Sequence, residues 1–181
     1  MTAVIVPHHI RLATPDDTDT VVRILIASKE ASFPDSIGDH DRDVEFWTNR
    51  WREYITSGSR AQMSRGDGWV FIAEVGGRPV GYIAYHHTTR HGTDAELQNI
   101  YLLKEYQRQG IGTHLLAVVA QQLLIDGSRT MCVGFDEFGP YKQFYFKHGA
   151  VALAPGAPWA IWDNVPALAA RLPRPLPSSL K

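Results

Sequence analysis

A glycine-containing loop between a strand and a helix is the feature of this sequence that most restricts its fold. The segment "AELQNIYLL", residues 95–103, predicts a strand, and residues 110–125 predict an amphipathic helix. Between them, "KEYQRQGIG" places Gly110 and Gly112 where the helix begins. Because glycine weakens a helix, two glycines at this point indicate a backbone that must approach something closely. Backbone N–H groups of such a turn, together with the helix N-terminus, form an anion site.

Two familiar phosphate-binding loops do not match this segment. No Lys-Ser or Lys-Thr pair follows the second glycine, which excludes a Walker A loop, and the third glycine of a dinucleotide-binding fingerprint is missing. An ordinary tight turn between a strand and a helix remains the alternative explanation of the two glycines.

The composition is that of one globular domain. The chain has 181 residues and a formal net charge of -1, without the basic excess typical of nucleic-acid-binding domains. Its single cysteine, Cys132, excludes an internal disulfide and fits a reducing compartment. No stretch resembles a signal peptide or a membrane span. We therefore expect a cytoplasmic domain over residues 1–170, with no nucleic-acid or membrane partner, and a tail rich in proline and serine over residues 171–181.

The order of the other elements predicts an α/β fold of the α+β kind. Thr14 and Pro15 carry a helix-start signature after a short strand, and "DVEFWTNRWREYI" predicts a second helix. Two strand-like runs flank a turn at Gly76 and Gly77, which predicts a hairpin. With the strands and short helix that follow residue 128, the order is β-α-α-β-β-β-α-β-α-β-β. We expect a mixed, mostly antiparallel central sheet of about six to seven strands, flanked by about four helices.

Taken together, "ELQNIYLLKEYQRQGIGTHLL" resembles the signature of the GNAT superfamily of acyl-CoA-dependent N-acetyltransferases. Gln107, Gly110 and Gly112 match the family's Gln/Arg-x-x-Gly-x-Gly/Ala loop. "IRLATPDD" is similar to the family's first strand and helix start, and "QFYFKHGAV" to its second cofactor-proximal motif. The resemblance covers about residues 10–165. It implies a GNAT-like fold and acetyl-CoA as cofactor, with the loop around the pyrophosphate and the preceding strand along the pantetheine arm.

The resemblance also implies roles for individual residues. It implies that backbone N–H groups of the strand bind the acetyl carbonyl and that the loop and its surroundings bind the rest of the cofactor. The cofactor-binding residues that it implies are Ile100, Tyr101, Leu102, Gln107, Arg108, Gln109, Gly110, Ile111, Gly112, Thr113 and Tyr141. Tyr145 matches the tyrosine that many members use as general acid toward the leaving thiolate. Glu96 matches the position of a catalytic glutamate that takes a proton from the amine. The alternative for Tyr145 is an aromatic residue of the core, and the alternative for Glu96 is an exposed charge at the start of a strand.

Three positions depart from the family pattern. Many members carry an asparagine and an alanine at the positions of Phe138 and Tyr141, and the missing asparagine removes a side-chain contact to the pantetheine. Arg108 stands where the consensus loop has another glycine. Its guanidinium could pair with a phosphate or remain in solvent.

The acceptor pocket of this family lies between the first two helices, the hairpin end and the last strands. In this chain those segments carry aromatic and imidazole side chains, namely Phe33, Trp47, Trp51, His86, His87, Trp159 and Trp162. They also carry the acidic run "FPDSIGDHDRDVE", and such a lining would suit a cationic amine. Packing in the core is the alternative for Trp47 and Trp51. Adjacent histidines on a strand point to opposite faces, so we expect no metal site.

The expected function is therefore transfer of an acetyl group from acetyl-CoA to a primary amine of a small molecule, by a monomer or a homodimer. An antibiotic or another cationic metabolite, a protein N-terminus and a lysine side chain are all acceptors that the sequence leaves open. A module that binds acyl-CoA without turnover and a nucleotide-binding domain are alternatives from other classes. Cys132, flanked by apolar residues, is expected to be an inert core thiol rather than a nucleophile.

Overall fold

The computed structural model describes residues 6–59, 63–136, 139 and 141–175. Within these residues the strands are β1 (His9–Leu12), β2 (Trp69–Val75), β3 (Arg78–His87), β4 (Ala95–Leu102), β5 (Met131–Gly134), β6 (Val151–Ala152) and β7 (Trp159–Trp162). The α-helices are α1 (Thr18–Ser32), α2 (Val44–Ser57), α3 (Ile111–Ile125), α4 (Lys142–Lys147) and α5 (Val165–Arg171). Short 3-10 turns precede α1 and α3, at Pro15–Asp17 and Lys104–Tyr106.

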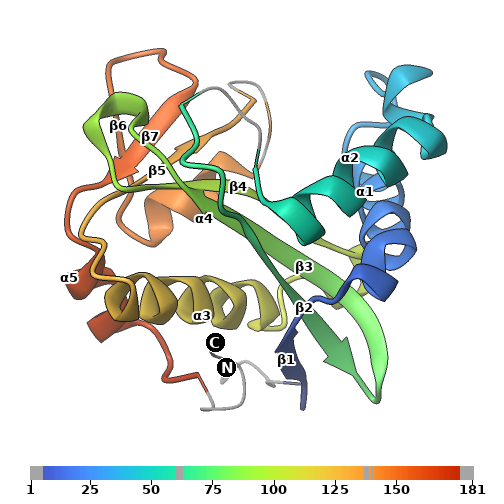
Figure 1. Cartoon of the computed structure of the whole chain (residues 1–181), viewed down its shortest axis with the longest axis horizontal. Coiled ribbons are helices and arrows are strands. Elements are labelled where there is room, and N and C mark those ends of the chain that lie inside the picture. Colours follow the sequence, from blue (N-terminus) through green and yellow to red (C-terminus); the bar gives the residue numbers. More distant parts are fainter. Residues whose placement is uncertain (1–5, 60–62, 137–138, 140, 176–181) are drawn as a thin grey trace.

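The strands form a single sheet in the order β1-β2-β3-β4-β5-β7-β6. Only β4 and β5 run parallel; the other neighbouring pairs are antiparallel. Helices α1 and α2 cover one face, and α3 lies across the other face with α5 beside it (Figure 1). The predicted mixed, mostly antiparallel sheet is confirmed, and the predicted order of its elements holds through β7.

Local sequence signals explain where the first elements begin and turn. Thr14 caps the turn at Pro15, and its backbone N–H and its hydroxyl both donate to the Asp17 carboxylate. The β2–β3 hairpin turns at Gly76 and Gly77, whose φ angles of 57° and 76° lie in the left-handed region that glycine enters easily. The helix start and the hairpin turn are therefore where the sequence predicts them.

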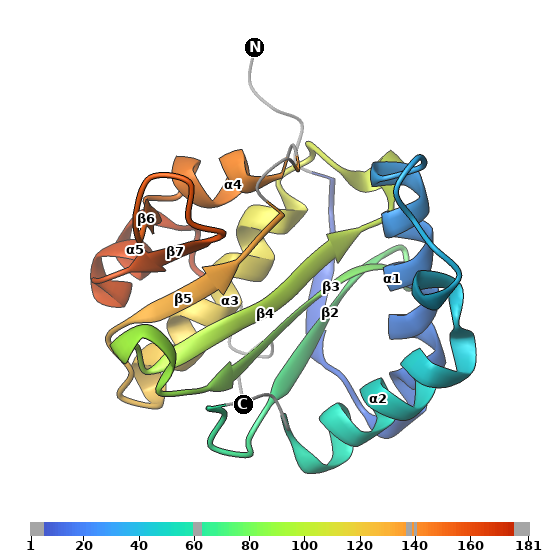
Figure 2. The same cartoon turned by 90° about the horizontal axis from the view of Figure 1, so that it is seen from above.

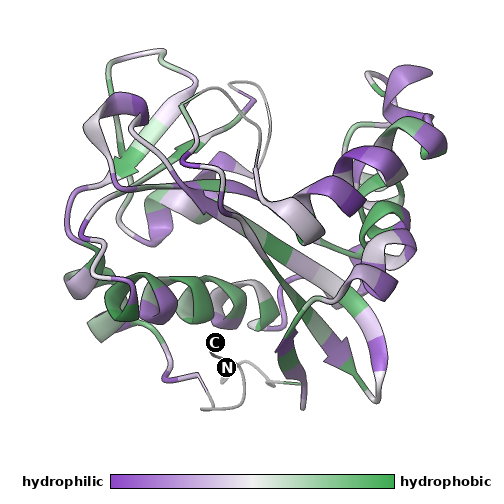
Figure 3. Cartoon of the chain, in the orientation of Figure 1, coloured by the Kyte–Doolittle hydropathy of each residue, from purple (hydrophilic) through white to green (hydrophobic). Residues whose placement is uncertain are grey.

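Helix α5 is the element that the sequence analysis did not predict. It packs against α3, so that Val165 and Leu168 join the same core as Val118 of α3. As a result α3 is buried around most of its circumference, and Figure 3 shows it mostly in the apolar colour. The prediction of an amphipathic helix over 110–125 was therefore right about a helix, which begins at Ile111, and wrong about a broad polar face.

Candidate active site

The parallel pair β4–β5 separates part of the way along its length. The two strands pair at Ala95–Met131, at Glu96–Cys132 and at Leu97–Val133, and no further. Beyond residue 97, β4 continues to Leu102 along β3, whereas β5 continues along β7. Figure 2 shows the two strands diverging toward the end of the sheet where α4 lies. The separation leaves one side of β4 without a neighbouring strand over residues 98–102.

A β-bulge at Gln98 stands where this separation begins. The register between β3 and β4 skips Gln98, which has no residue opposite it. Regular alternation would place Asn99 and Tyr101 on the same face as Leu97, toward α3. The bulge moves both side chains to the face that α1 and α2 cover, where Asn99 lines a cavity and Tyr101 packs against the core.

The bulge also sets which backbone groups face the separation. The Leu103 N–H donates to the Val80 carbonyl of β3 at 2.9 Å. In an antiparallel pair, residues that bond to the partner strand alternate with residues that do not. Tyr101 therefore bonds toward β3, while Ile100 and Leu102 turn their N–H and C=O groups toward the open side. The Leu102 carbonyl already accepts hydrogen bonds from Ser28 Oγ at 3.1 Å and from the Gln107 side chain. The backbone groups that face the separation and remain for a ligand are therefore the N–H and C=O of Ile100 and the N–H of Leu102.

The predicted anion loop follows directly after β4. Gly110 caps α3 with φ 85°, and Arg108 has φ 63°, so two residues of the loop lie in the left-handed region. The loop is tied to the strand because the Gln107 side chain donates to the Leu102 carbonyl at 3.0 Å. Gln109 donates to the Glu105 carbonyl at 2.7 Å. Neither glutamine amide therefore points freely toward a ligand, and the donors of the loop are its backbone N–H groups.

The first turn of α3 is packed closely against α4. A Cβ added at Gly112 would meet Leu102 and the Phe144 ring, each at 3.5 Å, which is ordinary contact. Thr113 lies beside His148, with 3.3 Å between Oγ1 and Nε2. The side chain of Ile111 is fully buried in the core. Of these loop residues, Ile111 and Thr113 can thus offer a ligand their backbone N–H rather than a free side chain.

Tyr145 projects from α4 into a mostly apolar environment. Its side chain packs against Phe135 and Trp162, with ring centroids 6.2 and 6.1 Å away. Its hydroxyl makes no side-chain hydrogen bond in the part of the chain that the structure describes. Burial, and secondarily the charge of Tyr101, raise the pKa of Tyr145 well above its usual value, which keeps the phenol protonated.

Tyr141 takes a different position from the other predicted cofactor contacts. Its hydroxyl donates to Ser32 Oγ at 2.8 Å, and its ring lies 6.0 Å edge-on from Phe33 at the end of α1. Tyr141 and Phe33 thus join α4 to α1 across the open end of the β4–β5 separation. Phe138, the other departure from the family pattern, lies outside the described residues.

A cavity of about 100 Å³ lies between α1, α2 and the bulged part of β4. It is lined by Leu25, Lys29, Trp47, Arg50, Trp51, Tyr54, Gln98, Asn99 and Tyr101. The sequence analysis predicted Trp47 and Trp51 here, and the structure brings both into the lining. The predicted acidic lining is not found, because the charged side chains that line this cavity are Lys29 and Arg50.

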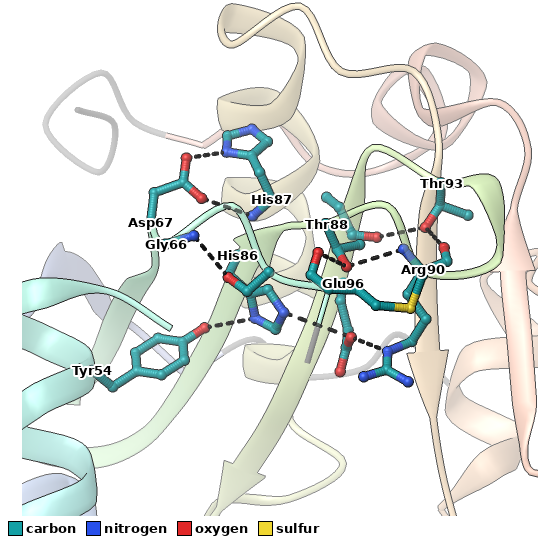
Figure 4. A network of polar contacts seen from close by, with 12 residues as sticks. Tyr54, Gly66, Asp67, His86, His87, Thr88, Arg90, Thr93 and Glu96 are labelled. Atoms are coloured by element: carbon teal, nitrogen blue, oxygen red, sulfur yellow. Dashed lines mark hydrogen bonds and ion pairs between the residues drawn. The ribbon is translucent and has the colours of Figure 1, made fainter. Parts of the chain in front are cut away.

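Glu96 lies in a buried polar network rather than at an exposed strand start. Its carboxylate accepts a hydrogen bond from Arg90 Nε at 2.8 Å and lies 3.6 Å from His86 Nε2. A 3.2 Å hydrogen bond joins His86 Nδ1 to the hydroxyl of Tyr54, as Figure 4 shows. Burial acts to raise the pKa of Glu96, but His86 and Arg90 outweigh it and hold the pKa below its usual value.

This network connects the cavity to Glu96. Tyr54 lines the cavity and is bonded to His86, and His86 is fully buried beside Glu96. His86 therefore lies behind the cavity wall rather than in it. Trp159 also lies outside the lining, and the Arg90 guanidinium stands 4.9 Å from its ring. Arg90 thus contacts both the Trp159 ring and the Glu96 carboxylate.

His86 and His87 point to opposite faces of β3, as their adjacent positions on a strand predict. His87 turns to the face opposite His86, where its ring contacts Asp67 at 2.7 Å. Among the described residues, no three His, Cys, Asp or Glu side chains are grouped in a way that could hold a metal ion. Cys132 is fully buried, and burial raises the pKa of its thiol to about 11, which makes it a poor nucleophile.

Six lining residues were not predicted from the sequence: Leu25, Lys29, Arg50, Tyr54, Gln98 and Asn99. Tyr54 follows Trp47 and Trp51 at helical spacing, so the aromatic stripe of α2 could have identified it. Gln98 and Asn99 are two consecutive polar residues in a strand that is otherwise apolar after Glu96. Such an interruption is the signal that a bulge leaves in a sequence.

The chain belongs to the GNAT acetyltransferase family, whose members use acetyl-CoA. The family model described as "Acetyltransferase (GNAT) family" matches residues 25–149, more than half of the chain. An uncharacterized N-acetyltransferase of Bacillus subtilis strain 168, YuaI, is 40% identical over 79 residues. That alignment covers 42% of this chain and 46% of YuaI, so it spans less than half of that relative.

Solved structures of the same fold cover nearly the whole domain. An acetyltransferase from Thermus thermophilus has a TM-score of 0.68 at 19% identity, over 88% of this chain and 98% of that one. PaiA N-acetyltransferase from Thermoplasma acidophilum, in complex with coenzyme A, has a TM-score of 0.67 at 17% identity, over 86% and 96%. At these identities the likeness shows the fold. In the described part of the chain, we find no helix with the length and apolar character of a membrane span.

Proposed function

We propose that this protein is an N-acetyltransferase that transfers the acetyl group of acetyl-CoA to a primary amine of a small molecule by direct attack in a ternary complex. The observation that carries the proposal is the separation of β4 from β5 beside the glycine loop. There, the backbone N–H groups of Ile100 and Leu102 and the start of α3 face the same open space. Acetyl-CoA would supply an electrophilic thioester carbonyl and a thiolate leaving group.

The residues present suit that cofactor. Backbone N–H groups of Gly110, Ile111, Gly112 and Thr113 would hold the pyrophosphate, since a helix N-terminus favours negative charge. Arg108, which is exposed and has no ion pair or hydrogen bond among the described residues, would add one positive charge. The N–H of Ile100 would donate to the carbonyl oxygen as it gains negative charge.

Tyr145 and Glu96 would handle the two protons of the reaction. The Tyr145 hydroxyl keeps its proton at neutral pH and has no competing side-chain acceptor among the described residues, which suits a general acid. Glu96 keeps its negative charge to low pH, and Tyr54 and His86 join it to the cavity. The proton of the attacking ammonium would leave along Tyr54 and His86 toward Glu96.

The size of the cavity favours a small acceptor over a protein. A volume of about 100 Å³ holds only several waters, since one water needs about 10–15 Å³ of such space. Such a space suits a compact group rather than an extended peptide. Acetylation of a protein N-terminus or a lysine is the alternative, and Lys29 and Arg50 at the cavity argue against a strongly cationic acceptor such as a polyamine or an aminoglycoside.

A module that binds acyl-CoA without turnover is the alternative from another class. It is motivated by Arg108 and Tyr141, which replace small residues of the family pattern. The deciding experiment incubates the protein with acetyl-CoA and a panel of small amines, lysine-containing peptides and buffer alone. Amine-dependent release of free thiol, with the acetylated amine identified by mass spectrometry, supports the enzyme. Coenzyme A binding without thiol release from any amine would favour the module.

A further inference from the structure

The last turn of α1 connects the two sides of the β4–β5 separation. The Ser28 hydroxyl donates to the carbonyl of Leu102, at the end of β4, at 3.1 Å. One turn further along α1, Ser32 Oγ accepts a 2.8 Å hydrogen bond from the hydroxyl of Tyr141, at the start of α4. Because residues four apart lie on the same face of a helix, one face of α1 holds both contacts. The end of β4, the end of α1 and the start of α4 are thus joined in sequence.

Tyr141 makes the outermost of these contacts. Its side chain is at the surface, with 41% of the residue exposed. Its ring also lies edge-on to Phe33, the residue that follows α1, with 6.0 Å between the ring centroids. A hydrogen bond and a ring contact therefore hold one exposed aromatic side chain across the open end of the separation, against the end of α1.

The position of Tyr141 relates it to both sides of the candidate active site. Tyr141 precedes Tyr145, the proposed general acid, by four residues, so the two tyrosines lie on the same side of α4. On α1, Ser32 follows Lys29 by three residues, and residues at this spacing are neighbours on the helix surface. Lys29 lines the acceptor cavity. The bond from Tyr141 to Ser32 therefore lies between the helix that lines the cavity and the helix that carries the proposed acid.

We propose that Tyr141 determines the size of the acceptor: bonded to Ser32, it closes the α1 side of the β4–β5 separation to bulky amines and admits compact ones. From Ser28 to Ser32 is one helical turn, a rise of about 6 Å. An extended peptide needs about 10 Å across its side chains, the spacing of packed sheets. The substrate class is therefore a compact primary amine rather than a polypeptide. This inference rests on the proposed acetyltransferase function.

The test compares primary amines that share their reacting end and differ in bulk. The pairs are glycinamide with the peptide amide Gly-Ala-Ala-Ala, ethanolamine with its O-benzyl ether, and any further amine of the thiol-release panel with a benzyl derivative. We expect kcat/KM of the parent protein to be at least about tenfold higher for the compact member of a pair. Tyr141→Ala removes the exposed ring and should lower that preference by about tenfold.

Two milder variants test the hydrogen bond alone. Tyr141→Phe and Ser32→Ala remove it from opposite ends and leave the ring beside Phe33. Each should lower the preference for the compact amine in the same direction as Tyr141→Ala, by a smaller factor that is the same for both. Leu12→Ala is the matched control, because Leu12 has almost the same exposure, 40%, but lies on β1 at the edge of the sheet. It should keep the parent preference.

The outcomes separate this inference from the proposed function. If Tyr141→Ala changes the rates of both members of a pair by the same factor, or leaves the parent preference intact, Tyr141 does not determine acceptor size and the acetyltransferase stands. A parent protein that prefers the bulky amines would overturn the inference as well. If neither the parent protein nor any variant releases thiol with any amine, the proposed function fails and this inference fails with it.

Discussion

The cofactor side and the acceptor side of the candidate active site differ in the groups that form them: backbone groups on the first and side chains on the second. The proposed cofactor side is one continuous segment, residues 107–113, and its donors are backbone N–H groups set by two residues in the left-handed region. The acceptor side draws side chains from α1, α2 and β4, between residues 25 and 101, and leaves several of their polar atoms unpaired. The cofactor side should therefore depend on backbone conformation, and the acceptor side on the identity of each side chain.

The largest effect is expected where the two sides meet, at the hydroxyl of Tyr145. Tyr145→Phe should lower turnover by roughly 10- to 1,000-fold, as loss of a general acid does, while acetyl-CoA binding stays normal. Steady-state rates and equilibrium binding check this. Tyr82→Phe is the matched control, since that tyrosine is also buried without a hydroxyl partner among the described residues. Normal turnover of Tyr145→Phe would remove Tyr145 from the mechanism.

The next effect concerns the carboxylate of Glu96. Glu96→Gln should lower kcat by roughly 10- to 100-fold near neutral pH, because the path from the cavity through His86 would end without a proton acceptor. The rate should recover partly at high pH, where more of the amine is already neutral. A pH profile identical in shape and height to that of the parent protein would exclude Glu96 as the base.

Asp17→Asn is the matched structural control for Glu96→Gln. Asp17 is also a buried carboxylate held by an arginine, with Arg11 nitrogens 2.8 Å from each oxygen, but it does not line the cavity. Arg11 is the main cause of its low pKa of about 2, against a usual 3.8. A depressed pKa stabilises the fold above the usual value and ceases to do so as pH falls through about 2.

The expected stability change for Asp17→Asn follows from that shift. Near neutral pH the variant should lose about 2 kcal/mol of unfolding free energy, and the difference from the parent should shrink below pH ~4. Urea unfolding across pH measures both, and turnover at 25 °C should stay normal. A stability difference that does not change with pH would contradict the ion-pair explanation.

A pair of glycine substitutions tests whether the cofactor side depends on backbone conformation. Gly110→Ala forces a side chain into φ 85°, which costs roughly 1–2 kcal/mol and should weaken coenzyme A binding by about tenfold. Gly112→Ala adds a methyl group at ordinary contact distance within a helix, so affinity should hold and stability should rise slightly. Calorimetric titration compares the two variants. Equal affinities would mean that the conformation at Gly110 does not matter for the cofactor.

The smallest effect is expected at Arg108. Arg108→Gly restores the family's glycine at φ 63° and relieves a strained backbone, so the protein should unfold at the same or a slightly higher temperature. Coenzyme A affinity should fall by a few-fold if the guanidinium pairs with a phosphate, an effect that weakens with added salt. Higher affinity in the glycine variant would instead show that the side chain hinders the loop.

Local signals in the sequence predicted the glycine loop and much of the fold. The loop at Gly110, the cap at Thr14 and the hairpin turn at Gly76 each depend on a few adjacent residues, and the structure places all three as predicted. The acceptor side depends on tertiary contacts that no short segment specifies. The bulge at Gln98 reverses which face Asn99 and Tyr101 occupy, and simple alternation along the strand predicts the opposite arrangement.

The sequence analysis also did not predict the positive charge of the side chains that line the acceptor side. The acidic run at residues 35–45 suggested an anionic pocket, but Asp41 pairs with Lys29 rather than lining the cavity alone. Arg50 reaches the cavity because α2 turns the same face inward at Trp47, Arg50 and Trp51. Helix α5 went unpredicted for a related reason. Its seven residues, "VPALAAR", are stabilised by packing on α3 rather than by their own length.

Thermal unfolding with acetyl-CoA, coenzyme A and ATP tests the central claim most directly, because every step of the proposed function requires that the loop and the β4–β5 separation hold this cofactor. At 100 times its dissociation constant, a ligand adds about 2.7 kcal/mol of stability. Both coenzyme A forms should produce that shift and ATP should produce a much smaller one. No stabilisation by either form of coenzyme A would contradict the assignment of the loop, and the proposed function would fall with it.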